Sequence, residues 1–85
     1  MDDLLPGTEG EEVLAIQLRL IELGYLKDRD YNTDGIYGNN LINALIDLQI
    51  ASGTLPELAD GLATVDLQTF LFSENALLFA IETNN

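Results

Sequence analysis

Large hydrophobic residues recur at helical spacing in the first third of the chain. Between positions 8 and 24 they return every three or four residues, at Val13, Ile16, Leu20 and Leu23. Side chains at this spacing share one face of an α-helix, which turns once in about 3.6 residues. Gly24 follows the last of them, as glycine commonly does where a helix ends. The pattern predicts a helix that ends at Leu23.

A polar signature marks the expected start of this helix. Thr8 stands three residues before Glu11, the spacing of a capping box. In such a box the hydroxyl accepts a hydrogen bond from a backbone N–H, and the carboxylate reaches back to another. We therefore expect the helix to begin just after Thr8. Beyond its end, Tyr25 and Leu26 are expected to fold back onto the core, before a polar loop over residues 27–33.

Two further helices follow from the same periodicity. One is expected from Asn39 to about Ala51, and a shorter one from Val65 or Asp66 to Phe72. Their predicted core residues are Ala44, Leu45, Leu48, Leu67 and Leu71. The residues between the two helices include a proline and two glycines, which favour a connector. We predict an all-α fold, a compact three-helix bundle over residues 1–73.

An apolar tail follows the predicted bundle. Residues 76–81 read Ala-Leu-Leu-Phe-Ala-Ile, ahead of a polar end. We assign residues 74–85 to a C-terminal tail or a junction. An apolar run of this kind is expected to pack on its own core, on a partner, or at a boundary with another segment.

Two Asp-Gly corner loops precede the second and third helices. Asp34-Gly35 and Asp60-Gly61 stand 26 positions apart and form an internal pseudo-repeat. Glycine takes a positive φ at no steric cost, and an aspartate side chain can accept a hydrogen bond from the local backbone. Both corners are therefore predicted to be structural turns.

The order of these motifs resembles the peptidoglycan-binding-like domain family. The resemblance covers Leu4 to Ser73 and includes the series Gly7, Gly10, Val13, Gln17, Leu20 and Leu23-Gly24-Tyr25 ahead of the first corner. It implies a three-helix, non-catalytic module that binds bacterial peptidoglycan and targets an attached enzyme or particle to the wall. Gln17 and Gln49, where the family also carries glutamine, are expected to be structural hydrogen-bonding residues across the bundle.

The resemblance directs attention to the first corner as a binding site. The candidate ligand-binding residues are Tyr31, Tyr37, Asn39 and Asn40, which combine aromatic faces and amides beside a helix N-terminus. Backbone N–H groups there can meet a stem-peptide carboxylate, and the amides can meet glycan or peptide. For Tyr25 and Tyr37 the favoured interpretation is a partly buried ring with its hydroxyl at the surface.

Two additional apolar stripes distinguish the chain from the family pattern, which usually has polar or basic residues at these positions. They consist of Leu14, Leu18 and Ile21 on the first helix and Ile42, Ile46 and Ile50 on the second. Such stripes indicate a second buried face, covered by the tail or by another protein. The alternative function is therefore that of a protein-docking or assembly subunit, for example in a phage-tail-like particle. Such a subunit would form a homo-oligomer or bind a larger protein partner.

Charge narrows the range of partners. The 85 residues include 15 acidic and 3 basic ones, for a net charge of −12. Nucleic acids and anionic membranes are bound through clustered Lys and Arg, so we expect no nucleic-acid partner and no membrane partner. The N-terminus also lacks the basic and apolar segments of a signal peptide. We expect a cell-wall or extracellular location for part of an exported protein or particle, and a cytoplasmic one if the chain is complete as given.

The residue types present argue against catalysis. The chain has no histidine and no cysteine, which removes the commonest general base and the most reactive nucleophile. No enzyme activity, cofactor or metal is expected. The series Asp30-x-Asn32-x-Asp34-Gly35 resembles the opening of a calcium-binding EF-hand loop, but Leu41 stands at the twelfth position, where a bidentate glutamate is needed.

Overall fold

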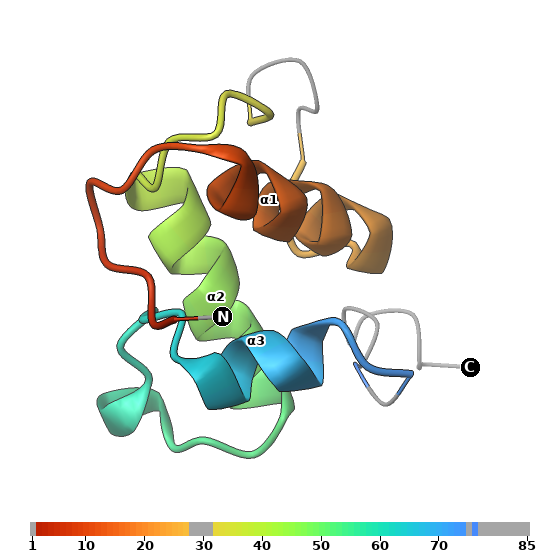
Figure 1. The fold of residues 1–85 in the computed structure, drawn as a ribbon. Helices are drawn as coiled ribbons and strands as arrows, with labels where there is room; N and C mark the ends of the chain where they lie inside the picture. Colours follow the sequence, from red (N-terminus) through yellow and green to blue (C-terminus); the bar gives the residue numbers. More distant parts are fainter. Residues whose placement is uncertain (1, 28–31, 75, 77–85) are drawn as a thin grey trace.

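The computed structural model of the protein describes residues 2–27, 32–74 and 76. Within them the chain forms three α-helices, α1 over Glu11–Leu23, α2 over Asn39–Ala51 and α3 over Val65–Leu71, and a 3-10 turn, η1, at Pro56–Leu58. In the view of Figure 1, α2 lies behind α1 and α3. The predicted all-α, three-helix fold is confirmed. None of the helices in the described residues has the length and apolar character needed to cross a membrane.

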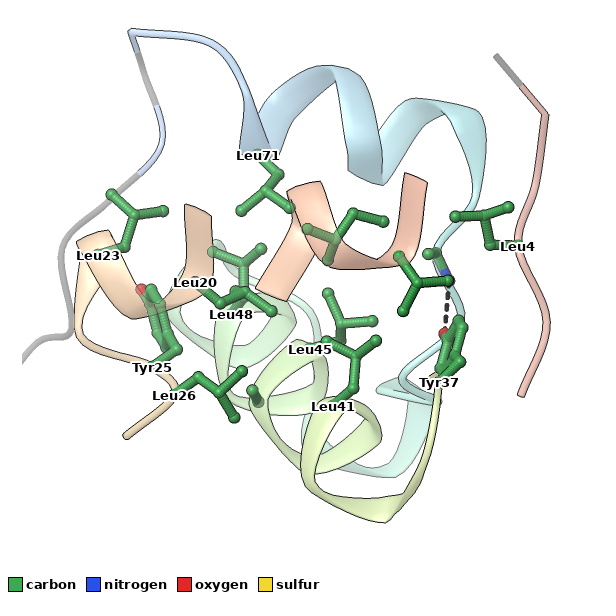
Figure 2. Close-up of a cluster of buried hydrophobic side chains, with 14 residues drawn as sticks. Leu4, Leu20, Leu23, Tyr25, Leu26, Tyr37, Leu41, Leu45, Leu48 and Leu71 are labelled. Atoms are coloured by element: carbon green, nitrogen blue, oxygen red, sulfur yellow. Dashed lines mark hydrogen bonds between the residues drawn. The ribbon is translucent and has the colours of Figure 1, made fainter. Parts of the chain in front are cut away.

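The hydrophobic core lies where the three helices meet (Figure 2). Every core residue predicted from helical spacing is buried except Leu67, which packs against the core but keeps partial exposure. Tyr25 and Leu26 fold back onto the core as expected. Leu41, at the start of α2, is also fully buried. It was not among the predicted core residues, although it precedes Ala44 and Leu45 by three and four positions and so shares their face of the helix.

The start of α1 differs from the expectation. The helix begins at Glu11 with Gly10 as its N-cap, and no side chain caps it. Thr8 does not form the predicted capping box. Its carbonyl instead accepts a hydrogen bond from the N–H of Tyr37 at 3.0 Å. Pairing with a distant segment therefore overrides the local helix-start signal.

That pairing belongs to an N-terminal strap, residues 2–10, which runs beside both Asp-Gly corners. The N–H of Leu4 donates to the carbonyl of Ala63, and the N–H of Gly10 donates to the carbonyl of Gly35, both at 2.9 Å. In Figure 1 the strap is the red segment that descends from α1 toward α3. The strap ties the loops before α2 and α3 to each other and so fixes where these two helices begin.

Candidate functional site

The first Asp-Gly corner is held by Gln17 from α1. The Gln17 Nε2 donates to Asp34 Oδ1 at 3.0 Å, and its Oε1 accepts from the N–H of Gly35 at 2.9 Å. Asp34 Oδ1 also accepts from the N–H of Ile36 at 3.0 Å. These donors, the Gln17 amide foremost, hold the pKa of Asp34 below its ordinary value because they stabilise the charged carboxylate. Gly35 takes a φ of 69°, so the predicted turn chemistry is confirmed.

The second corner repeats this arrangement with Gln49 from α2. The Gln49 Nε2 donates to Asp60 Oδ1 at 3.1 Å, and its Oε1 accepts from the N–H of Gly61 at 2.9 Å. The N–H of Leu62 donates to the same Asp60 oxygen at 3.0 Å and is the main cause of a lowered Asp60 pKa. The expected structural role of both glutamines is confirmed, with the corners as their partners.

Tyr37 joins the two corners from inside the fold. Its side chain is 1% exposed, and its hydroxyl donates to the carbonyl of Gly61 while accepting from the N–H of Ala63. Figure 2 shows Tyr37 beside the hydrophobic cluster. Burial raises the pKa of this phenol. The expectation of a surface hydroxyl is therefore wrong for Tyr37, and the ring offers no open face to a ligand in this structure.

A polar hollow of about 410 Å³ opens at the start of α2. It is lined by Gln17, Asn32, Asp34, Ile36, Gly38, Asn39, Asn40 and Leu41. Asn39 and Asn40 are exposed in the first turn of the helix, and the N-cap residue, Gly38, makes no side-chain cap. The first backbone N–H groups of a helix have no partner within the helix. The hollow therefore combines two amide side chains with the donor end of α2.

Asn32 is a polar residue of this hollow that was not among the predicted ligand-binding residues. It is buried, its Nδ2 donates to the carbonyl of Lys27, and its Oδ1 accepts from Asn40 Nδ2 at 3.0 Å. Asn32 thereby fixes the orientation of the Asn40 amide. Its place in the calcium-like series was the available signal. Tyr31, the fourth predicted ligand-binding residue, lies outside the described residues.

The apolar stripe on α2 is partly covered by the protein's own second corner. At Gly61 the position of a Cβ atom would lie 2.8 Å from Ile42 Cγ2 and 3.3 Å from Ile46 Cγ1. The expectation that only the tail or another protein covers this stripe is thus corrected for these two residues. Ile50, at the far end, is 41% exposed. On α1, the three residues Leu14, Leu18 and Ile21 are partly buried.

Carboxylates do not gather into a metal-binding group anywhere in the described part of the chain. Asp34, the acid of the calcium-like series that the structure describes, already accepts hydrogen bonds from Gln17 and Ile36. Asp28 and Asp30 lie outside the described residues. The corner acid thus has a structural role in the turn itself.

Comparison with known proteins gives one family and two similar structures. Residues 9–70 match the family described as a putative peptidoglycan binding domain. The crystal structure of the SleB N-terminal domain is similar at 29% identity, with a TM-score of 0.69 over 81% of this chain and 86% of that one. An L,D-transpeptidase structure from Xylanimonas cellulosilytica is similar at 34% identity, with a TM-score of 0.68 over 84% of this chain and 32% of that one. No curated protein sequence matches the chain.

Proposed function

The chain belongs to the putative peptidoglycan binding domain family, and we propose from this premise that it binds the bacterial cell wall through the polar hollow at the start of α2. The observation that carries the proposal is the exposure of Asn39 and Asn40 at a helix N-terminus without a side-chain cap. Hydrogen bonds between the strap and the residues Gly35 and Tyr37 restrain the backbone that leads into this surface. A site built on rigid elements loses little entropy when it binds.

The chemistry of the hollow suits neutral polar groups and one carboxylate. Asparagine amides donate and accept at once, which matches the acetamido and hydroxyl groups of a glycan and the amides of a stem peptide. The N–H groups that begin α2 favour a carboxylate. Of the described residues that line the hollow, Asp34 alone carries a charge, and two donors already engage it.

The module itself is proposed to be non-catalytic, with any chemistry supplied by an attached domain. The similar transpeptidase chain is about three times as long as the part that matches, because the match covers 32% of it. By analogy, binding here would hold an attached enzyme or particle at the wall. The place of action would then be the cell wall.

Titration of the protein with purified muropeptides, followed by NMR, tests the proposal. We expect shift changes centred on Gly38, Asn39 and Asn40, and at least a several-fold weaker affinity in Asn39→Ala and Asn40→Ala. Asn43→Ala is the matched control, because Asn43 is an exposed asparagine of the same helix outside the hollow. Tyr31→Ala tests the predicted aromatic contact, since Tyr31 directly precedes Asn32. Stem peptide and sugar chain offered separately distinguish the two ligand sources.

Absence of binding at millimolar ligand, or shifts confined to α1 and α3, would refute this site. The alternative, a protein-docking function, is favoured by the 41% exposure of Ile50 and the 44% exposure of Phe72. Sedimentation over a range of concentrations tests it in the homo-oligomeric form, and a concentration-independent monomer counts against that form. A net charge of −12 opposes contact between two copies.

A further inference from the structure

The Asp-Gly dipeptide of each corner is chemically reactive. It occurs twice in the 85 residues, at Asp34-Gly35 and Asp60-Gly61, and Asn-Gly does not occur. In such a pair the backbone nitrogen of the glycine can attack Cγ of the aspartate, because glycine has no side chain to hinder the approach. Binding of the cell wall makes no use of this reactivity, so the corners have a second property to be explained.

The reaction needs no reactant other than water. The glycine nitrogen loses its proton and bonds to Cγ, while the protonated carboxyl group loses its hydroxyl, and the two leave together as water. The product is a succinimide ring, which water opens at either of two carbonyls. Opening at one carbonyl restores aspartate. Opening at the other moves Cβ of the residue into the main chain, which gives isoaspartate, so the net change is an isomerisation.

At the second corner, Gln49 holds both reacting groups. Its Oε1 accepts from the N–H of Gly61 at 2.9 Å, and its Nε2 donates to Asp60 Oδ1 at 3.1 Å. The attacking nitrogen therefore keeps its proton. The donors to Asp60, the Leu62 N–H foremost, lower its pKa and keep the carboxylate ionised, the form that a nucleophile attacks least readily. The corner must open before it can react.

The first corner is held more firmly than the second. Gln17 is 3% exposed and makes a third bond, from Nε2 to the carbonyl of Ile36 at 3.3 Å, besides the two that match those of Gln49. Gln49 is only partly buried, and its bond to Asp60 is exposed to solvent. Bonds open to water are lost more often in local fluctuations, so Asp60 is released more often than Asp34.

We propose that Asp60 is a site of spontaneous isoaspartate formation and that Gln49 limits the rate. Isomerisation lengthens the main chain of the corner by one Cβ atom. It thereby displaces the Gly61 carbonyl and the Ala63 N–H from the Tyr37 hydroxyl, which bonds to both. The altered chain loses the bonds that join its two corners.

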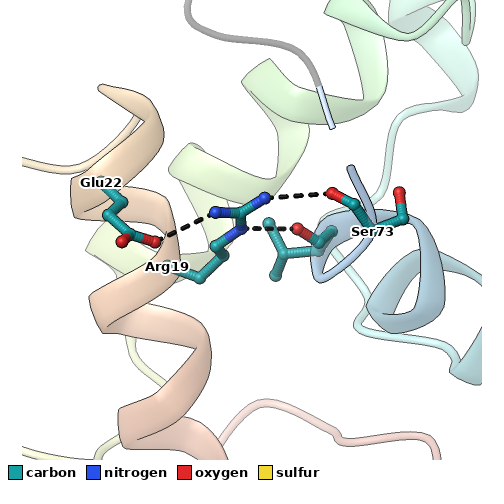
Figure 3. Close-up of polar contacts among 4 residues, drawn as sticks. Arg19, Glu22 and Ser73 are labelled. Carbon is teal, nitrogen blue, oxygen red and sulfur yellow. Dashed lines mark hydrogen bonds and ion pairs between the residues drawn. The ribbon is translucent and has the colours of Figure 1, made fainter. Parts of the chain in front are cut away.

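The far end of α3 has an anchor of its own, so the change remains local (Figure 3). Arg19 of α1 donates from Nε to the carbonyl of Leu71 at 2.8 Å and from Nη2 to the carbonyl of Ser73 at 3.1 Å. Its Nη1 pairs with Glu22 at 3.0 Å, which orients the guanidinium from its own helix. The last carbonyls of a helix lack partners within it and favour a cation. α3 therefore stays tied to α1 when the second corner loosens.

Ageing of the full 85-residue chain at neutral pH tests the proposal. Peptide mapping by mass spectrometry measures isoaspartate at each corner, and the denatured chain gives the unrestrained rate of each dipeptide. We expect conversion at Asp60 to be several-fold slower in the folded chain than in the denatured one, and conversion at Asp34 to be slower still. The aged chain should keep its helical circular dichroism but melt at a lower temperature.

Two reciprocal variants separate the glutamines from the rest of the fold. Gln49→Ala should raise the rate at Asp60 several-fold and leave that at Asp34 unchanged, and Gln17→Ala should do the reverse. Asn43→Ala is the matched control and should change neither rate, because Asn43 is an exposed residue of α2. Circular dichroism of each variant checks that the helices remain folded.

Four outcomes would overturn the proposal. Conversion at Asp60 as fast in the folded chain as in the denatured one would mean that the fold does not restrain it. Faster conversion at Asp34 than at Asp60 would reverse the order expected from burial. An unchanged rate at Asp60 in Gln49→Ala would remove the glutamine from the account. Equal acceleration of both corners in each variant would show that global unfolding sets the rate.

Discussion

The Tyr37 hydroxyl accepts a hydrogen bond from the N–H of Ala63 at 3.0 Å. Tyr37 and Ala63 are equivalent positions of the pseudo-repeat, the first in the first corner and the second in the second. Each stands three positions after its corner aspartate, Asp34 or Asp60. The two halves of the pseudo-repeat are therefore joined at equivalent positions. A large side chain in one half supplies the contact, and a small residue in the other leaves space for it.

Tyr37→Phe should destabilise the fold without moving the ring. The change leaves the Gly61 carbonyl and the Ala63 N–H without their hydroxyl partner, and a buried polar group without a partner costs about 1–3 kcal/mol. Urea melts measure the loss, and hydrogen exchange should become faster at the Ala63 amide. A free energy of unfolding within about 0.5 kcal/mol of the wild type, a typical result for a surface change, would contradict this role.

The same residue predicts an alkaline limit to stability. The folded-state pKa of Tyr37 is raised above its ordinary value of 10.0 by burial. Its contribution is thus fully present below pH 10 and is lost as the pH rises from that value through the raised pKa, because the unfolded phenol ionises first. Melts between about pH 9 and 11, a range around the ordinary tyrosine value, should show this loss in the wild type and less of it in Tyr37→Phe.

Gln17→Glu should reverse the pH dependence of the first corner. In the wild type the Asp34 pKa is lowered, so its contribution is present above the ordinary value of 3.8 and declines as the pH falls through the lowered pKa. In the variant two carboxylates face each other where Nε2 and Oδ1 now stand 3.0 Å apart. The pair shares a proton at a raised pKa, so stability should increase as the pH falls from 7 toward about 5.

Gln49→Glu gives an internal replicate, because Gln49 holds Asp60 in the same geometry. Denaturant melts at several pH values are the measurement for both variants. Stability that falls steadily from pH 7 to pH 5 in both would show that the glutamine amides do not control the corner acids.

Gly61→Ala should cost more stability than Gly7→Ala. Both glycines have a positive φ, 70° and 95°, which costs a residue with a Cβ about 1–2 kcal/mol. Only at Gly61 would the new Cβ also meet backbone, the carbonyl oxygen of Ile42 at 2.8 Å, whereas nothing lies within 4 Å at Gly7. Thermal melts compare the two. Equal melting temperatures for the two variants would mean that α2 and the second corner can move apart without loss of stability.

Leu48→Ala should remove about 2–5 kcal/mol from the free energy of unfolding, the range for a leucine lost from a core. Leu48 is fully buried between the helices. Leu58→Ala is the control, because that leucine in η1 is 66% exposed. Denaturant melts that gave the two variants similar losses would show that the core has been wrongly assigned.

The helices and most of the core followed from periodicity alone. α2 begins and ends at the predicted residues, and α3 ends one residue earlier than expected. Local signals are enough to locate these helices because an apolar face marks each helix and a turn residue marks its end. Gly24, with a φ of 93° at the end of α1, is an example.

The corrections concern contacts between segments far apart in sequence. Thr8 has the local signature of a helix cap, but its carbonyl pairs with Tyr37, 29 positions away in the sequence. Tyr37 looked amphipathic and half-exposed, yet its hydroxyl finds two backbone partners inside the fold. Periodicity carries no information on such partners. For the hollow, the sequence indicated Asn39 and Asn40 but not Asn32. Asn32 accepts a hydrogen bond from Asn40 only because the fold of its loop brings the two side chains together.

The strap has a consequence for how the protein is made. Asp3 Oδ1 accepts from the N–H of Val65 at 2.7 Å, and the carbonyl of Asp2 accepts from Gln68 Nε2 at 2.7 Å. Asp2 and Asp3 thus find these partners only after α3 has left the ribosome. Contacts of such long sequence separation form late, because the intervening chain must be ordered first. A nascent chain stopped before Val65 should hold α1 and α2 without a closed fold, and it becomes a folded domain only when α3 is released.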